Sequence, residues 1–228
     1  MPSPHLSREE GVYLHGNTAM GKLTRAIGLM SGTSMDGIDV ALLDTDGADV
    51  VQRGPSHTYP YSPVFREQLR AGLADAAAIR RRDERPGRLR LLEQYLTDLH
   101  AEAVHQFCED YGVEAGSVDV IGFHGHTVLH RPTRTERHST PTGVALSAVS
   151  ATLTVQIGDG QALAARTGID VIWDLRANDC AHGGHGAPLV PVYHRALVTR
   201  LPQRPVAVVN IGGVANITWI GRGGDLIA

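Results

Sequence analysis

The stretch Gly32-Thr33-Ser34-Met35-Asp36-Gly37 lies between two short apolar runs, residues 26–30 and 38–43. The turn-forming Asp44-Thr45-Asp46-Gly47 closes this unit. Short apolar runs bounded by turn residues are typical of strands, because glycine adopts the backbone conformations that a tight turn needs. The stretch therefore predicts a strand, a glycine-rich loop and a second strand.

The same loop carries groups that suit a phosphate. Glycines let the backbone approach closely, and successive N–H groups with the hydroxyls of Thr33 and Ser34 can hold phosphate oxygens. Asp36 and Asp39 would repel a phosphate directly, but carboxylates bind Mg²⁺, which bridges to phosphate. The loop matches neither G-x-x-x-x-G-K-[ST] nor G-x-G-x-x-G, so the common nucleotide-binding folds are disfavoured. The alternative is an ordinary turn.

Predicted helices and strands alternate after this unit. One helix begins near Ser62, with Pro63 in its first turn and one side formed by Val64, Phe65, Leu69 and Leu73. The clearest helix ends at Gly112 and has apolar residues at steps of three and four: Leu89, Leu92, Leu96, Leu99, Ala103 and Phe107. Strands are predicted at residues 118–123, 154–157 and 169–173, and further helices at 162–167 and from Pro188 to about Arg200. This alternation indicates an α/β fold.

The last residues repeat the opening design. Residues 206–211 and 215–220 are apolar runs joined at Gly212-Gly213, so a second hairpin is predicted, the start of a duplicated lobe. Two strands cannot bury their own faces, so the sequence reads as a fragment. We expect a flexible leader at 1–24, a lobe at 25–203 with a Thr-, Ser- and Pro-rich surface insertion at 133–152, and a truncated second lobe at 204–228.

Two further polar segments follow predicted strands. His124-Gly125-His126-Thr127 suits a loop that presents His or Thr to a sugar hydroxyl, with metal binding by these and other histidines as the less favoured alternative. Asp174-Leu175-Arg176 lies at the carboxyl end of a strand, where open α/β sheets bind ligands. Arg176 could clamp a carboxylate; the alternative is a capping Asp with a surface Arg. The loop from Gly183 to Pro188 could bind an anion at a helix start or simply pack tightly.

Composition excludes several classes of protein. The chain has 228 residues, 42% of them hydrophobic, and a formal net charge of −3, which favours a globular protein and gives no sign of nucleic-acid or membrane-surface binding. Lys22 is the only lysine, so no lysine serves as nucleophile or phosphate ligand after the first strand. No apolar run approaches the ~20 residues of a membrane helix. Two distant cysteines, Cys108 and Cys180, fit a reducing cytoplasm.

Several blocks together resemble the anhydro-N-acetylmuramic acid kinase family. They are Gly28 to Asp39, Gly122 to Thr127 with His130 and Pro132, Thr154 to Asp159, Thr167 to Ile169, Asp174 to Arg176, Gly183 to Pro191, and Asn210 to Gly213. The resemblance implies an actin/hexokinase-like, ribonuclease H-like lobe with a mixed sheet and flanking helices, followed by the first hairpin of a second lobe. It implies ATP and Mg²⁺ as cofactors, a small sugar as substrate, and a homodimer for the full-length protein.

The resemblance also implies roles for particular residues. ATP phosphates would contact Gly32, Thr33, Ser34, Met35, Asp36, Gly37, Ile38 and Asp39, together with Asn210, Gly212 and Gly213 of the second hairpin. Sugar would contact His124, Gly125, His126, Thr127, Asp174 and Arg176. The implied reaction opens the 1,6-anhydro ring with water while the freed 6-oxygen attacks the γ-phosphate, which gives N-acetylmuramic acid 6-phosphate in cell-wall recycling. No metal is expected at the histidines.

The chain departs from the family pattern in three ways: by substitutions, by a longer insertion and at its end. His126 and His185 stand where the family usually has Gln, and Leu175 where it has Phe. The insertion at 133–152 is longer than usual. The family's catalytic aspartate lies in an Asp-x-Gly-Pro-Gly-Asn segment expected just past Ala228, so we expect little or no activity from this chain alone. A non-catalytic nucleotide- or sugar-binding remnant is the second hypothesis, and a histidine-metal hydrolase the third.

Overall fold

The protein folds around one mixed β-sheet. The structure, a computed structural model, describes residues 23–132, 134–139, 145–150, 152–211 and 215–228. The sheet has the order β3 (Val51–Pro60), β2 (Gly37–Thr45), β1 (Thr24–Ser31) and β4 (Val120–Arg131), and β4 also pairs with β7 (Leu153–Ile157) and β8 (Val171–Trp173). Strand β2 is antiparallel to β1 and β3, whereas β1, β4 and β8 run parallel. This is the α/β arrangement expected from the alternation of elements, with the mixed sheet and flanking helices that the resemblance implied.

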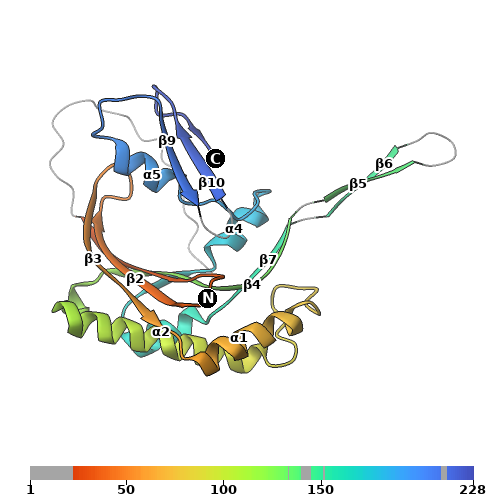
Figure 1. Cartoon of the computed structure of the whole chain (residues 1–228), viewed down its shortest axis with the longest axis horizontal. Coiled ribbons are helices and arrows are strands. Elements are labelled where there is room, and N and C mark those ends of the chain that lie inside the picture. Colours follow the sequence, from red (N-terminus) through yellow and green to blue (C-terminus); the bar gives the residue numbers. More distant parts are fainter. Residues whose placement is uncertain (1–22, 133, 140–144, 151, 212–214) are drawn as a thin grey trace, which may run out of the picture.

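Helices cover one face of the sheet (Figure 1). They are α1 (Pro63–Ala76), α2 (Leu89–Tyr111) and α3 (Gly160–Thr167), and a short 3-10 turn, Ala115–Ser117, follows α2. Ser62 caps α1, because its side chain accepts a hydrogen bond from the Phe65 N–H at 3.2 Å. Gly112 ends α2 in a left-handed conformation, with φ 61°. Both boundaries were predicted.

The buried side of α1 differs from the prediction. Phe65 and Leu69 are buried as expected, but Val64 is 69% and Leu73 37% exposed, and Gly72 and Ala76 take their place. Gly72 lies against Leu92 of α2 so closely that a Cβ would come within 2.5 Å of its side chain. The small residues therefore face α2. The spacing of large apolar side chains in the sequence does not predict this packing.

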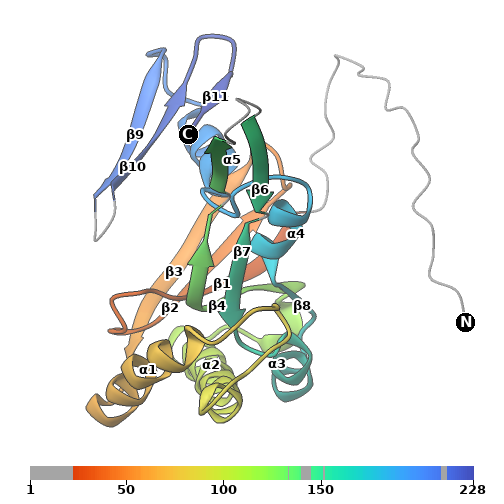
Figure 2. The same ribbon diagram turned by 90° about the vertical axis from the view of Figure 1, so that its right-hand side faces the viewer.

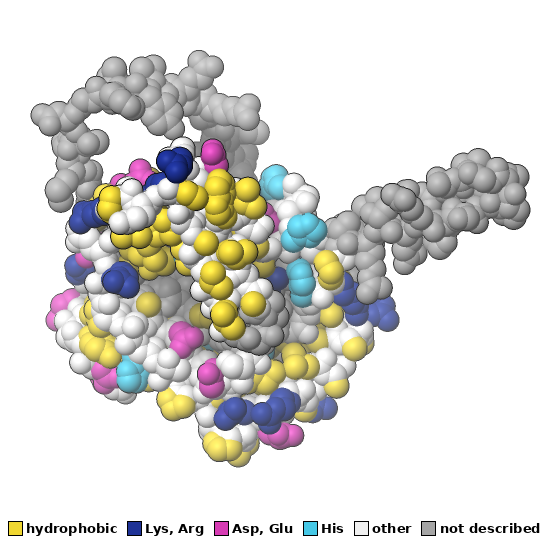
Figure 3. Space-filling view, turned by 45° about the horizontal axis from the view of Figure 1, so that its top comes forward, with side chains coloured by type: hydrophobic (Ala, Val, Ile, Leu, Met, Phe, Trp, Pro, Cys, Tyr) yellow, Lys and Arg dark blue, Asp and Glu magenta, His cyan; other side chains and the backbone are white. Residues whose placement is uncertain are grey.

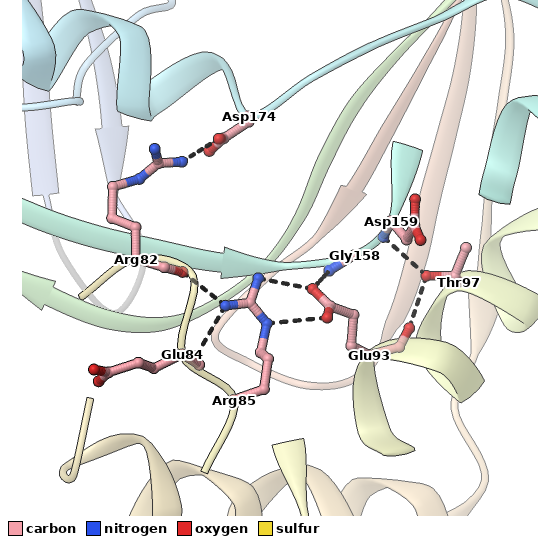
Figure 4. A network of polar contacts seen from close by, with 8 residues as sticks. All are labelled: Arg82, Glu84, Arg85, Glu93, Thr97, Gly158, Asp159 and Asp174. Carbon is pink, nitrogen blue, oxygen red and sulfur yellow. Dashed lines mark hydrogen bonds and ion pairs between the residues drawn. The ribbon is translucent and has the colours of Figure 1, made fainter. Parts of the chain in front are cut away.

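The first turns of α2, supported by the charged connection before it, bind the turn after β7 (Figure 4). Arg85 forms an ion pair with Glu93, and Glu93 Oε1 accepts the N–H of Gly158 at 3.1 Å. Thr97 Oγ1 accepts the N–H of Asp159 at 3.0 Å. These bonds hold the turn from which Asp159 caps α3.

The opposite face of the sheet carries α4 (Leu175–Ala181), α5 (Pro191–Val198) and a second sheet (Figure 2). That sheet has the order β11 (Leu226–Ile227), β10 (Ala215–Ile220), β9 (Val206–Ile211), all antiparallel. The predicted hairpin at 206–220 is thus confirmed in its strands. Its inner side packs on α5, where His194 Nδ1 and Thr218 Oγ1 are hydrogen-bonded at 2.9 Å.

Five local expectations were wrong or incomplete. Strand β3 was not predicted, because this edge strand is mostly polar and exposed. Helix α5 begins at Pro191 rather than Pro188, and α4 was not expected. The insertion contains a hairpin, β5 (Arg134–Ser139) and β6 (Ala145–Ser150), that extends from the body in Figure 1. His124 to Thr127 lie inside β4 rather than in a loop after it, because β4 extends past β8 to pair with β7.

Candidate functional site

A cleft of about 590 Å³ joins the glycine-rich loop to the predicted sugar-binding residues. Its lining includes Thr33 from the loop, His124 and Thr127 from β4, and Arg176 from α4. Residues of the predicted phosphate site and the predicted sugar site, more than 90 positions apart in the chain, therefore meet in one place. The rest of the lining is formed by Met30, His130, Gly186, Ala187, Leu189 and Val190.

The loop is a tight turn with an exposed polar rim. The Met35 N–H donates to the Gly32 carbonyl at 3.0 Å, and Met35 has φ 55°, a left-handed conformation that costs a non-glycine residue free energy. Its side chain is only 6% exposed, so burial holds the turn in this shape. Thr33 and Ser34 remain exposed. Gly37 is required at the end of the loop, since a Cβ there would lie 2.3 Å from the Tyr59 carbonyl oxygen.

Two carboxylates follow in the loop and in β2, and both are exposed. Asp36 Oδ1 accepts the Ser34 hydroxyl at 2.6 Å, and this hydrogen bond together with backbone N–H groups lowers the pKa of Asp36. Asp39 Oδ1 accepts the Thr58 hydroxyl at 2.5 Å. Exposed carboxylates are oxygen ligands of the kind that Mg²⁺ prefers.

Arg176 brings a positive charge into the cleft. Its Nε donates to the Gly186 carbonyl at 2.7 Å, its Nη1 to Thr127 Oγ1 at 3.1 Å, and its Nη2 lies 3.2 Å from His130 Nδ1. None of these acceptors is a carboxylate, and burial lowers the pKa of Arg176. Among the described residues no Asp or Glu forms an ion pair with it. An anionic ligand would therefore meet an uncompensated guanidinium.

Asp174 and Arg176 are separated by the structure although they share a motif. Asp174 precedes α4 with φ 59° and forms an ion pair with Arg82. It lines a second, smaller pocket of about 60 Å³ with Arg82 and Arg85, and His124 borders both pockets. Figure 4 shows the Arg82–Asp174 pair next to the Arg85–Glu93 network. Asp174 therefore forms a surface ion pair, but its side chain makes no capping hydrogen bond to α4, so the expected alternative of a capping Asp is not found. Arg176 instead lines the larger cleft.

The two histidines of the β4 motif also differ in position. His124 Nδ1 lies 2.9 Å from the Gly125 carbonyl, so this nitrogen carries the proton and Nε2 is an acceptor. Burial lowers the pKa of His124. His126 is fully buried, with Nδ1 hydrogen-bonded to Ser31 Oγ at 2.9 Å. Gly125 between them has φ 70°, and β4 contains a bulge here, so the two histidines do not follow the regular alternation of a strand.

Other predicted residues lie outside this cleft. Asn210 is exposed at the end of β9, whereas Gly212 and Gly213 lie outside the described residues. No group of three His, Cys, Asp or Glu suited to a metal is found in the part of the chain that the structure describes. His182 and His194 instead bond to Asn178 and Thr218.

Three lining residues were missed because they are apolar: Met30, Leu189 and Val190. The position of Met30 directly before the loop, and that of Leu189-Val190 after the Gly183–Pro188 segment, were the available signals. No helix of the described residues is both long and apolar enough to span a bilayer.

The fold and the cleft define an α/β lobe built on a mixed sheet with flanking helices, followed by a second, three-stranded sheet. The chain belongs to the anhydro-N-acetylmuramic acid kinase family, whose model matches residues 24–228. The family expected from the motifs is thereby confirmed.

Relatives named anhydro-N-acetylmuramic acid kinase include one from Brucella canis, 54% identical over 212 residues, and one from Agrobacterium fabrum, 52% identical over 212 residues. Each alignment covers 92% of this chain and 52% of the relative, so the chain spans about half the length of these relatives. YeaZ from Pseudomonas aeruginosa overlaps 90% of this chain and 65% of its own, with 17% identity and a TM-score of 0.30, which adds nothing to the fold assignment.

Proposed function

We propose that this chain forms the ATP- and sugar-binding front part of a kinase that phosphorylates 1,6-anhydro-N-acetylmuramic acid. The reaction would open the anhydro ring with water and give N-acetylmuramic acid 6-phosphate, a step of peptidoglycan recycling and amino-sugar metabolism. Family membership supports the kinase class. The observation that carries the substrate is Arg176, an uncompensated guanidinium in the cleft that Thr33 also lines.

The sugar would lie against β4 and α4. Its lactyl carboxylate would bind Arg176, because a guanidinium holds a carboxylate by charge-assisted hydrogen bonds. Thr127 and the unprotonated Nε2 of His124 would bind sugar hydroxyls. The apolar Leu189 and Val190, which also line the cleft, would contact the ring carbons. Asp174 would act indirectly, by its ion pair with Arg82 at the start of α4.

The nucleotide phosphates would lie on the loop. Backbone N–H groups of residues 32–37 and the hydroxyls of Thr33 and Ser34 would hold the oxygens. Asp36 and Asp39 fit a Mg²⁺ ion, since both are exposed and hydrogen bonds to Ser34 and backbone N–H groups favour the ionised form of Asp36. Such an ion would neutralise charge on the transferred phosphoryl group. Asn210, with Gly212 and Gly213, would contribute from the second hairpin.

The remaining machinery is proposed to come from the half of the relatives that this chain does not match. It would supply the general base for the attacking water and the other wall of the nucleotide site. We place the reaction in the cytoplasm, where the free Cys108 and Cys180 would stay reduced, without nucleic-acid or membrane partners and as a homodimer at full length.

Calorimetry with two sugars tests the substrate. 1,6-Anhydro-N-acetylmuramic acid should bind this chain at least about tenfold more tightly than 1,6-anhydro-N-acetylglucosamine, which lacks the lactyl carboxylate. Arg176→Gln should abolish the difference, and Arg70→Gln, at a surface pair with Glu67, should preserve it. Equal affinities in the unaltered chain would contradict the proposal. Phosphate transfer by the chain joined to the C-terminal half of the Brucella canis relative separates the kinase from a non-catalytic remnant.

A further inference from the structure

Tyr61 makes hydrogen bonds on both sides of the glycine-rich loop. It lies just after β3, and its backbone N–H donates to the Asp36 carbonyl at 3.0 Å. Its hydroxyl donates to Ser31 Oγ at 2.8 Å. Ser31 is the last residue of β1 and Asp36 is the last before β2, so the four residues 32–35 lie between two points held by one tyrosine.

The side-chain bond continues into the strand that lines the cleft. Ser31 Oγ accepts from Tyr61 and forms a second hydrogen bond, 2.9 Å long, with His126 Nδ1. All three side chains are buried, with exposed fractions of 6% for Tyr61, 1% for Ser31 and 0% for His126. Burial raises the pKa of Tyr61 and lowers that of His126 to about 4, so the tyrosine keeps its proton and the histidine stays neutral.

The bulge in β4 brings His126 into this chain of bonds. Leu29 is opposite Phe123, but Ser31 is opposite His126, so β4 contains one extra residue at this point. Gly125 makes the bulge possible, because a Cβ there would lie 2.4 Å from the Ile157 carbonyl oxygen. The next residue, Thr127, lines the cleft and accepts from Arg176. Tyr61, Ser31 and His126 thus connect the loop to the strand carrying Thr127.

We propose that Tyr61 is a positioning residue that sets the shape of the glycine-rich loop and its place relative to Thr127 and Arg176. The inference rests on the proposed phosphate-binding role of the loop. Tyr61 does not line the cleft described above; it acts through Ser31 and the Asp36 carbonyl. Loss of its hydroxyl frees the β1 side of the loop while the backbone bond to Asp36 remains, so the loop samples conformations that do not bind phosphate.

The test removes the hydroxyl of Tyr61 and, in a control variant, that of Tyr59. Tyr61→Phe keeps the edge-to-face contact with Phe65, whose ring centroid lies 4.9 Å away, and loses only the hydroxyl. The control is Tyr59→Phe, because the Tyr59 hydroxyl bonds to Asp110 at 2.7 Å, away from the loop. Calorimetry with Mg·ADP should show a Kd about fivefold higher for Tyr61→Phe, the effect of one hydrogen bond, and an unchanged Kd for Tyr59→Phe.

A second measurement needs no ligand. Amide hydrogen exchange at residues 33–36 should be faster in Tyr61→Phe than in Tyr59→Phe at matched urea stability. Ser31→Ala should give the same acceleration, and combining it with Tyr61→Phe should add nothing further. His126→Gln, whose side-chain amide can donate to or accept from the Ser31 hydroxyl, should retain the slow exchange.

The two measurements distinguish a failure of the proposed phosphate site from a failure of the positioning role. If the unaltered chain binds no Mg·ADP but Tyr61→Phe accelerates loop exchange, the phosphate site is wrong and the positioning role stands. If exchange at residues 33–36 is the same in Tyr61→Phe and Tyr59→Phe, the positioning role is wrong, whatever the nucleotide affinity.

Discussion

Arg85 and Glu93 form a two-pronged ion pair, with Nε to Oε2 at 3.0 Å and Nη2 to Oε1 at 2.9 Å, and side chains only 16% and 18% exposed. Glu93 Oε1 also accepts the Gly158 N–H, so the pair supports the turn that opens α3. Removal of one partner leaves a largely buried charge without compensation. We expect Arg85→Ala to lower the free energy of unfolding by about 2 kcal/mol, as measured by urea denaturation.

The control for this change is Arg81→Ala. Arg81 pairs with Asp83, but both side chains are well exposed, at 74% and 68%. Its loss should cost less than about 1 kcal/mol. Equal effects of the two substitutions would contradict the supporting role of the Arg85–Glu93 pair.

Gly37 and Gly122 offer a matched pair of strand glycines. A Cβ at Gly37 would lie 2.3 Å from the Tyr59 carbonyl oxygen, so Gly37→Ala must separate β2 from β3 beside the loop. At Gly122 no heavy atom lies within 4 Å of such a Cβ. We expect Gly37→Ala to destabilise by about 2 kcal/mol and Gly122→Ala to be neutral or stabilising. Thermal unfolding measures the stability of both variants. A Gly37→Ala variant as stable as the unaltered chain would contradict the expected cost of separating the two strands.

His100 should make stability depend on pH. Burial within α2 and the sheet lowers its pKa to about 4, against an ordinary value of 6.5. The unfolded chain therefore takes up a proton that the folded chain does not, and stability is lost as the pH falls from about 6.5 towards 4. The slope from this group approaches about 1.4 kcal/mol per pH unit, with His126 adding to it.

His100→Leu should make this pH dependence shallower, because it removes the group and its unpartnered buried Nε2. His105→Leu, at an exposed site on the same helix, should leave the slope unchanged. Urea denaturation midpoints measured between pH 4.5 and 7.5 give the pH dependence of stability in each variant. Identical slopes in the two variants would mean that another group causes the acid loss.

The outer face of the second sheet should bind hydrophobic dyes. Val209, Ile211, Ile217 and Ile227 are between 52% and 81% exposed, and Figure 3 shows hydrophobic side chains gathered over this part of the molecule. Contiguous exposed apolar surface binds dyes and promotes association. We expect Ile211→Ser with Ile217→Ser to lower anilinonaphthalene sulfonate fluorescence, and Leu91→Ser, at an exposed site on α2, to change it little.

Local patterns predicted the elements whose cause is local. Ser62 with Pro63 starts α1, Gly112 ends α2, and the hairpin around Gly32 to Gly37 forms as expected, because caps, helical spacing and turn glycines act within a few residues. Strand β3 was missed because an edge strand needs few apolar residues. The split of Asp174 from Arg176 was not predictable from their spacing, since it depends on Arg82, 92 positions away from Asp174.

The sequence by itself determined the family, the α/β class, and the glycine-rich loop with its hydroxyls and carboxylates, since these follow from residue types and short spacings. Only the tertiary structure decided which of these residues share a site. It placed Thr33, His124, Thr127 and Arg176 around one cleft and left His126 buried outside the lining, bonded to Ser31. The physical reason is the bulge at Gly125, which is set by pairing with both β1 and β7, strands far from it in the chain.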